Sequence, residues 1–151
     1  MNPDELLKAP NCSGVYYFRN KLNGKYYVGQ AERLRRRLRK HVSNAKLSRY
    51  NNPLYRAINK YGWENFEWGI LETFTEGTLE ERKTKLDIAE EKYIKLYNSY
   101  GSTGYNQTRG GDGGIKGYKY TKEQRQHVSE NSKKVSRDGR YVIYYYNVKT
   151  K

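Results

Sequence analysis

The sequence predicts a small α/β domain of the α+β type, in which a three-stranded antiparallel sheet is flanked by helices. Two tyrosine-rich segments, 14–20 and 25–30, are predicted strands, and the Asn23-Gly24 pair between them is typical of a hairpin turn. Segment 66–73 roughly alternates apolar and polar residues and predicts the third strand. Helical periodicity predicts helices over 32–45, 53–61 and 79–98.

The first helix carries many basic residues beside one apolar stripe. The stripe has helical spacing and consists of Leu34, Leu38, His41, Val42 and Ala45. With about 100° between successive residues, Arg36 and Arg39 are expected to point to solvent. Arg35 and Arg37 flank the stripe, and only a flanking arginine can reach a site beside the core. His41 follows Arg37 by one turn, where it is either a hydrogen-bonded core residue or part of a site.

The second helix has clear signals at both ends. Asn52 is a favourable cap, Pro53 suits the first helical position, and Gly62 follows the last helical residue. Its apolar stripe is predicted to consist of Leu54, Ala57, Ile58 and Tyr61.

The third helix contains a carboxylate within its apolar stripe. The stripe runs through Leu86, Glu90, Tyr93, Ile94 and Tyr97, whereas Glu91 is expected to point away from it. A carboxylate in such a position is unfavourable unless it is paired or holds a metal ion. Glu90 is therefore either one partner of an ion pair with Arg37 or an oxygen ligand of Mg²⁺.

The strongly positive charge points to nucleic acid as the partner. The chain has 151 residues and a formal net charge of +14, and only 35% of its residues are hydrophobic. A net positive charge of this size is a common electrostatic signature of proteins that bind phosphate groups of nucleic acid. Tyrosine hydroxyls on a hairpin beside an arginine-rich helix could bind or act on a phosphate group.

Other classes of protein fit the sequence poorly. The chain lacks an apolar run of about 18 residues, which argues against a membrane partner, and its N-terminus does not have the pattern of a secretory signal. Cys12 is the single cysteine, so an internal disulfide is excluded and a reducing cytoplasm is expected. Cys12, His41 and His127 do not have the spacing of a zinc site. An obligate protein partner is not indicated.

A change in composition predicts two parts, a catalytic domain over 1–106 and a flexible basic arm over 107–151. The glycine-rich segment 109–114 marks the break. The arm has eleven Lys and Arg residues against four acidic residues. It is either a solvated linker or a phosphate-binding arm, and its charge favours the arm. Segment 140–148 resembles a strand without a partner, which predicts that the chain continues in a longer protein.

Several motifs together resemble the GIY-YIG nuclease domain in their order and spacing. They are Gly14-Val15-Tyr16, Tyr27-Val28-Gly29, the downstream Arg37 and His41, Glu90-x-x-Tyr93-Ile94, and Gly104-Tyr105-Asn106. The resemblance covers residues 13–106 and departs from the family pattern only where valine replaces isoleucine in both tripeptides. It is strongest to phage and group I intron homing endonucleases, and segment 117–134 is similar to a nuclease-associated modular repeat.

The resemblance implies a metal-dependent endonuclease that hydrolyses phosphodiester bonds in double-stranded DNA. It implies that Glu90 binds Mg²⁺, with Mn²⁺ as a substitute, and that Arg37 stabilises charge on the phosphorane. Tyr16 and Tyr27 would orient or deprotonate the attacking water, which requires Arg37 and the metal to lower the pKa of Tyr16. His41 joins the catalytic set, and Gly14, Gly29 and Asn106 support the site.

The predicted DNA-binding residues are basic side chains of the first helix and of the arm. They are Arg33, Arg35, Lys40, Lys119, Lys122, Arg125, Lys133 and Lys134. Two other functions stay open at this point: a restriction or repair nuclease with the same fold, and a nucleic-acid-binding protein that does not cleave. The four residues Tyr16, Tyr27, Arg37 and Glu90 argue against the second.

Overall fold

The computed structural model describes residues 1–47 and 51–111, and it contains the predicted antiparallel sheet. The strand order is β2-β1-β3, so β1 is central and β2 lies at one edge. This position of β2 matters for function, because side chains on both faces of the sheet can meet around an edge strand. The strands are β1 (Ser13–Asn20), β2 (Tyr26–Ala31) and β3 (Phe66–Phe74).

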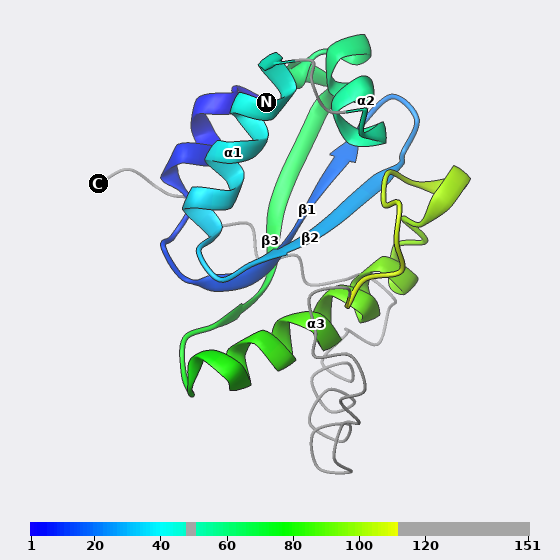
Figure 1. The fold of residues 1–151 in the computed structure, drawn as a ribbon. Coiled ribbons are helices and arrows are strands. Elements are labelled where there is room, and N and C mark those ends of the chain that lie inside the picture. Colours follow the sequence, from blue (N-terminus) through cyan, green and yellow to red (C-terminus); the bar gives the residue numbers. More distant parts are fainter. Residues whose placement is uncertain (48–50, 112–151) are drawn as a thin grey trace, which may run out of the picture.

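Helices cover both faces of the sheet. Figure 1 shows α1 and α2 on one face and α3 on the opposite face. Each face has its own hydrophobic core, one built with residues of α1 and α2 and the other with residues of α3. The helices are α1 (Leu34–Leu47), α2 (Pro53–Tyr61) and α3 (Leu79–Leu96), with short 3-10 segments at Pro3–Lys8, Trp63–Asn65 and Gly101–Thr103.

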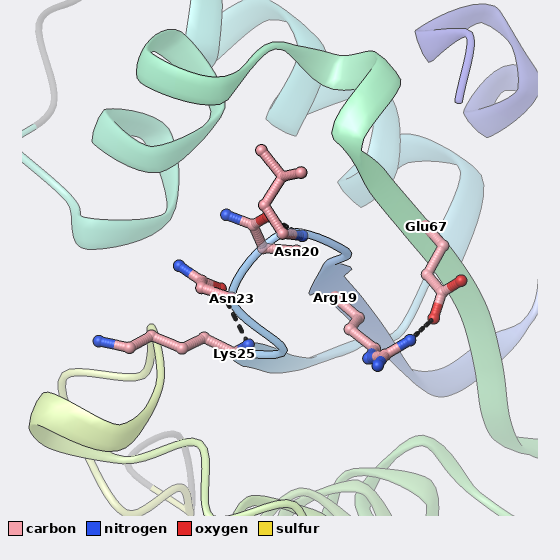
Figure 2. Close-up of polar contacts among 6 residues, drawn as sticks. Arg19, Asn20, Asn23, Lys25 and Glu67 are labelled. Carbon is pink, nitrogen blue, oxygen red and sulfur yellow. Dashed lines mark hydrogen bonds and ion pairs between the residues drawn. The ribbon is translucent and has the colours of Figure 1, made fainter.

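The hairpin turn between β1 and β2 is stabilised by two asparagine side chains. The Asn20 side chain accepts from the backbone N–H of Leu22, and the Asn23 side chain accepts from that of Lys25, each at 3.0 Å (Figure 2). Gly24 has a φ of 72°, a conformation that glycine adopts without strain. On the neighbouring strand pair, Arg19 forms an ion pair with Glu67 at 2.9 Å (Figure 2). The turn therefore fixes the register of the two tyrosine-rich strands.

The helix boundaries differ slightly from those predicted. α1 begins at Leu34 rather than at residue 32, whereas α2 has the predicted limits and its Asn52 side chain accepts from the backbone N–H of Leu54. α3 ends at Leu96 rather than at residue 98, because Asn98 has a φ of 48° and cannot continue a right-handed helix.

The predicted stripe of α1 is buried with the expected phase. Leu34, Leu38, His41 and Ala45 are buried, while Arg36 and Arg39 are exposed. The two flanking arginines differ from each other. The Nε of Arg35 donates to the carbonyl of Ala9, 2.7 Å away, on the N-terminal segment. Arg37 is half-buried and is the flanking arginine that faces the tyrosines of the sheet.

The segment after α3 runs beside the edge strand β2 (Figure 1). The backbone N–H of Tyr105 donates to the carbonyl of Tyr26 at 2.9 Å. Asn106 contacts the backbone of Val28 twice, accepting from its N–H at 2.9 Å and donating to its carbonyl at 2.8 Å. Part of the exposed edge of β2 is thereby covered. Within the described residues, no helix is both long enough and apolar enough to cross a bilayer.

Candidate active site at the edge strand

The strands sort the predicted site residues between the two faces of the sheet. Alternate residues of a strand point to opposite faces, so Tyr16 of β1 and Tyr27 of β2 lie on the face that α1 covers. Val15, Tyr17 and Val28 pack with α3 on the other face. Glu90 belongs to α3, and its charge still raises the pKa of Tyr27, although burial has the larger effect. The site is therefore built around the edge formed by β2.

Tyr16 is fully buried, and its hydroxyl is held by His41. The distance from Tyr16 Oη to His41 Nε2 is 2.5 Å. The other ring nitrogen of His41, Nδ1, lies 2.8 Å from the hydroxyl of Tyr55 on α2. Asn44 donates to the same Tyr55 oxygen at 3.2 Å. His41 is thus a buried histidine with partners on both nitrogens, in a chain of hydrogen bonds that starts at Tyr16.

Arg37 brings a positive charge to this chain of hydrogen bonds. Its Nε donates to Tyr16 Oη at 3.4 Å, and its guanidinium interacts electrostatically with Tyr27. Burial, assisted by the positive charges of Arg37 and Lys40, lowers the pKa of His41 to about 3. The imidazole is therefore neutral at physiological pH, and its unprotonated nitrogen can accept a hydrogen bond.

Arg37 alone does not bring the pKa of Tyr16 below its usual value, and the expected joint effect of Arg37 and a bound metal ion stays a prediction. Burial raises the pKa of the Tyr16 hydroxyl well above 10, and Arg37 opposes this shift only in part. Burial likewise raises the pKa of Tyr27. Both tyrosines are therefore neutral in this structure. Tyr16 can lose its proton only if that proton is transferred to an acceptor, and His41 Nε2 is already in contact with it.

The two motif glycines leave room for specific neighbours. A Cβ atom on Gly29 would lie 2.5 Å from Tyr16 Oη and 2.6 Å from its Cζ, so any side chain there would displace the tyrosine. A Cβ on Gly14 would lie 2.6 Å from the Glu72 carbonyl oxygen and 2.8 Å from Leu34 Cδ1. Gly29 thus allows Tyr16 to approach the backbone of β2, and Gly14 allows α1 and β3 to approach β1.

Glu90 is half-buried and receives two N–H donors on one carboxylate oxygen. Gln30 Nε2 donates to Glu90 Oε2 at 3.0 Å, and the backbone N–H of Gly111 donates to the same oxygen at 3.3 Å. The neighbouring Glu91 is exposed, as predicted. The contact also shows that the chain beyond Asn106 returns to α3 at Gly111. The division into a domain and an arm at residue 106 stays a prediction.

Comparison with known proteins identifies the family. The model of the GIY-YIG catalytic domain matches residues 12–106, which is more than half of the chain. The chain belongs to the GIY-YIG family. The predicted fold class is also confirmed, since the sheet and its helices match those of a solved GIY-YIG structure, the catalytic domain of I-TevI.

Two relatives of the GIY-YIG chain come from Neurospora crassa. "Probable intron-encoded endonuclease 1" is 35% identical over 121 residues, which cover 80% of this chain and 37% of that protein. "Probable intron-encoded endonuclease bI1" is 32% identical over 131 residues, which cover 83% of this chain and 27% of that protein. The chain therefore spans well under half the length of either relative.

Among solved structures, the catalytic domain of the homing endonuclease I-TevI is similar in sequence and in fold. It is 32% identical, and its TM-score of 0.54 applies to 64% of this chain and 98% of that domain. A mutant of the same domain, described as an intron endonuclease, gives the same identity and TM-score. The GIY-YIG chain thus carries a catalytic domain of an endonuclease family.

Three polar residues of the GIY-YIG site were not predicted from the sequence. Tyr55 contacts His41 from α2, and Gln30 and Asp87 form a hydrogen bond at 2.5 Å next to Glu90. For Gln30, strand alternation offered a signal, because Gln30 shares the face of Val28, which packs against α3. Asp87 precedes Glu90 by three residues and therefore lies near it on the helix. Tyr55 had no signal, because it lies outside the predicted stripe of α2.

The predicted DNA-binding residues at α1 lie on the surface of the GIY-YIG domain, with Arg33 just before the helix and Arg35 and Lys40 within it. Arg33 and Lys40 are exposed, and Arg35 is exposed while its Nε is held by the carbonyl of Ala9. Their contact with DNA stays a prediction. The remaining predicted DNA-binding residues lie outside the described part of the chain: Lys119, Lys122, Arg125, Lys133 and Lys134.

Proposed function

We propose that this chain is the catalytic part of a site-specific endonuclease of the homing type, which hydrolyses phosphodiester bonds in double-stranded DNA. The observation that carries the proposal is the arrangement at the edge strand. The buried Tyr16 hydroxyl lies between a neutral histidine and an arginine, and a carboxylate lies nearby on α3. The names of the two Neurospora relatives and of I-TevI support the homing type.

Double-stranded DNA is the substrate that fits the charge of the chain. The net charge of +14 favours a polyanion, and several cationic side chains of α1 are exposed on the helix that carries Arg37. Cationic side chains of this kind provide most of the affinity for a phosphate backbone without reading its sequence. The recognition of a particular site would then depend on parts of the protein beyond the described residues.

A divalent cation fits the donor set at Glu90. The carboxylate is half-buried at the sheet edge, and oxygen ligands of this type suit Mg²⁺, which keeps several water ligands and takes others from substrate phosphate. Among the described residues, His, Cys, Asp and Glu side chains do not gather in a group of three that could hold a metal ion. Glu90 would thus be the protein ligand for Mg²⁺ or Mn²⁺. When bound, the cation supplies positive charge that stabilises the phosphate and its leaving oxygen.

The hydrogen bonds of Tyr16 provide a route for a proton. In the tautomer whose Nδ1–H donates to Tyr55, His41 Nε2 is the acceptor for the Tyr16 proton. Tyr16 could then take a proton from a water that reaches its buried hydroxyl, as it passes its own to His41. Burial opposes a free tyrosinate and also opposes a lasting imidazolium on His41. His41 is therefore proposed as a transient proton acceptor along the Tyr16 hydrogen bond, with Tyr16 as the group in between.

Arg37 would stabilise negative charge on the reacting phosphate. Its guanidinium lies between Tyr16 and Tyr27, which fix its position, and it keeps its charge at any physiological pH. A preorganised cation beside developing charge typically contributes a factor of about 10² to 10³ in rate. Tyr27, which is half-buried, would orient the water or the phosphate.

The proposal is tested by cleavage of a library of random-sequence duplexes with the full-length protein and Mg²⁺, followed by sequencing of the new ends. We expect the wild-type protein to cut at a defined site. Glu90→Gln should abolish cleavage and change duplex affinity by no more than a few-fold. Glu91→Gln is the matched control, because Glu91 is the adjacent carboxylate but is exposed.

Two results would contradict the proposal. The first is wild-type protein that binds duplexes tightly but cuts none of them with either Mg²⁺ or Mn²⁺, which would indicate a binding protein. The second is a Glu90→Gln variant that cuts at the wild-type rate. Cleavage without a preferred site would retain the nuclease assignment and reject the homing type.

A further inference from the structure

We infer that Gln30 and Asp87 position the Glu90 carboxylate for metal binding, with Asp87 orienting the Gln30 amide and Gln30 holding Glu90. This inference rests on the proposed function, in which Glu90 is the metal ligand. It is carried by a chain of hydrogen bonds that joins the edge strand β2 to α3. The chain runs from Asp87 Oδ1 to Gln30 Nε2 at 2.5 Å and from Gln30 Nε2 to Glu90 Oε2 at 3.0 Å.

Gln30 is placed between the two carboxylates by the alternation of β2. Val28 and Gln30 point to the same face of the sheet, and Val28 packs into the core against α3. Asp87 and Glu90 are three residues apart on α3, a spacing that places them side by side on the helix surface. The Gln30 amide is therefore held where it can contact both carboxylates simultaneously.

The chemistry of the amide makes this arrangement specific. The Gln30 nitrogen has two hydrogens, one for each carboxylate, and carboxylate oxygens can only accept. If the amide were turned around, its carbonyl oxygen would face two acceptors. Two negative groups thus fix the orientation of one neutral side chain, and that side chain in turn fixes Glu90.

Asp87 is the unexpected member of this chain of hydrogen bonds. It is only 3% exposed, and a buried carboxylate is unfavourable unless it has strong hydrogen bonds. An apolar residue at this position of α3 would serve the hydrophobic core better. Asp87 is deeper than Glu90, which is half-buried, so it is poorly placed to meet a metal ion from solvent. Its contact with Gln30 gives it a role in orienting the amide.

A second donor acts on the same oxygen of Glu90. The backbone N–H of Gly111 approaches Oε2 at 3.3 Å, and Gly111 has a φ of 72° in that position. Both donors therefore hold Glu90 by Oε2. Residues that orient a metal ligand in this way typically change metal affinity or activity by about 10- to 100-fold when they are replaced.

The test measures metal binding without DNA or turnover. The full-length protein is titrated with Tb³⁺, whose luminescence is excited through nearby tyrosines, and Mg²⁺ is used as a competitor. Gln30→Met keeps the length and approximate volume of the side chain but removes the N–H donors. Asp87→Asn keeps the shape but removes the charge that orients the amide. Glu91→Gln is again the control, and urea unfolding shows whether each variant is folded.

We expect Gln30→Met to weaken Tb³⁺ and Mg²⁺ binding by about 10- to 100-fold. Asp87→Asn should weaken binding to a smaller extent, and Glu91→Gln should leave it unchanged. If Gln30→Met does not fold, Gln30→Asn replaces it, since that amide is one methylene too short to contact both carboxylates.

The outcomes separate the failure of this inference from the failure of the proposed function. Wild-type affinity in Gln30→Met, together with abolished binding in Glu90→Gln, overturns the inference alone. Abolished binding in Asp87→Asn with retained binding in Gln30→Met also overturns it, because Asp87 would then be a direct ligand. If Glu90→Gln binds metal as the wild-type protein does, the metal site of the proposed function is itself wrong.

Discussion

His41 should make the stability of the protein depend on pH in a way that can be calculated. Its pKa is lowered from 6.5 to about 3 in the folded protein, by burial and by the charges of Arg37 and Lys40. In the unfolded chain a histidine keeps its ordinary pKa near 6.5. Between these two values the unfolded state binds about one proton more than the folded state. Stability therefore rises with pH in this window and is lost as the pH falls below about 6.5.

The size of the effect follows from the difference between the two pKa values. Each pH unit inside the window changes the free energy of unfolding by about 1.4 kcal/mol per proton. Between pH 7.5 and pH 4.5, His41 alone should therefore reduce stability by about 2–3 kcal/mol. Protonation of carboxylates also contributes in this range, so the wild-type protein must be compared with a variant that lacks only the histidine.

The assay is urea unfolding of the wild-type protein and of His41→Gln at both pH values. Glutamine can occupy the site but does not titrate, and the carboxylate contributions cancel in the difference. We expect the stability of the wild-type protein relative to the variant to fall by about 2–3 kcal/mol from pH 7.5 to pH 4.5. A constant difference would refute the reasoning, because His41 would then titrate equally in both states and could not be buried and neutral.

Three further predictions concern the site and the arm. Arg37→Ala should reduce the single-turnover cleavage rate by a factor on the order of 10², whereas Arg36→Ala on the solvent side should leave the rate nearly unchanged; the reverse would show that the helix phase is wrong. Gly29→Ala should abolish cleavage, because its Cβ would displace the Tyr16 hydroxyl. The tyrosine absorbance on alkaline titration would report this displacement, and a fully active variant would contradict the prediction. Removal of 107–151 should weaken DNA binding and flatten its salt dependence, by about 0.9 in log–log slope for each phosphate that is no longer bound; an unchanged slope would show that the arm is a passive linker.

The fold could be predicted because local signals agreed with tertiary packing. The Asn23-Gly24 turn and the tyrosine-rich strands predicted the hairpin, and the Asn52-Pro53 start gave α2 its observed beginning. The phase of α1 was correct because its apolar stripe is long enough to fix the buried face. The bulge in β3 could not be predicted. It arises where Val15 pairs with Glu72 while Tyr16 pairs with Ile70, and only the packed sheet defines that register.

The site was predicted less completely than the fold. The motif spacing predicted Tyr16, Arg37 and Glu90 as site residues, but it did not show that burial raises the pKa of Tyr16 or that His41 contacts its hydroxyl. Asp87 was overlooked because a polar residue next to an apolar stripe usually faces solvent. Its burial depends on the packing of α3 against β2, which joins residues far apart in the sequence.

Direct attack of water on the phosphate is the central claim, and the stereochemistry of cleavage tests it most directly. A duplex with one chiral phosphorothioate at the mapped cleavage position is cut in H₂¹⁸O under single-turnover conditions with Mn²⁺. We predict one ¹⁸O atom in the product phosphate and inversion of configuration at phosphorus. Retention of configuration, or DNA covalently linked to Tyr16 or Tyr27, would contradict the claim, because a tyrosine would then be the nucleophile.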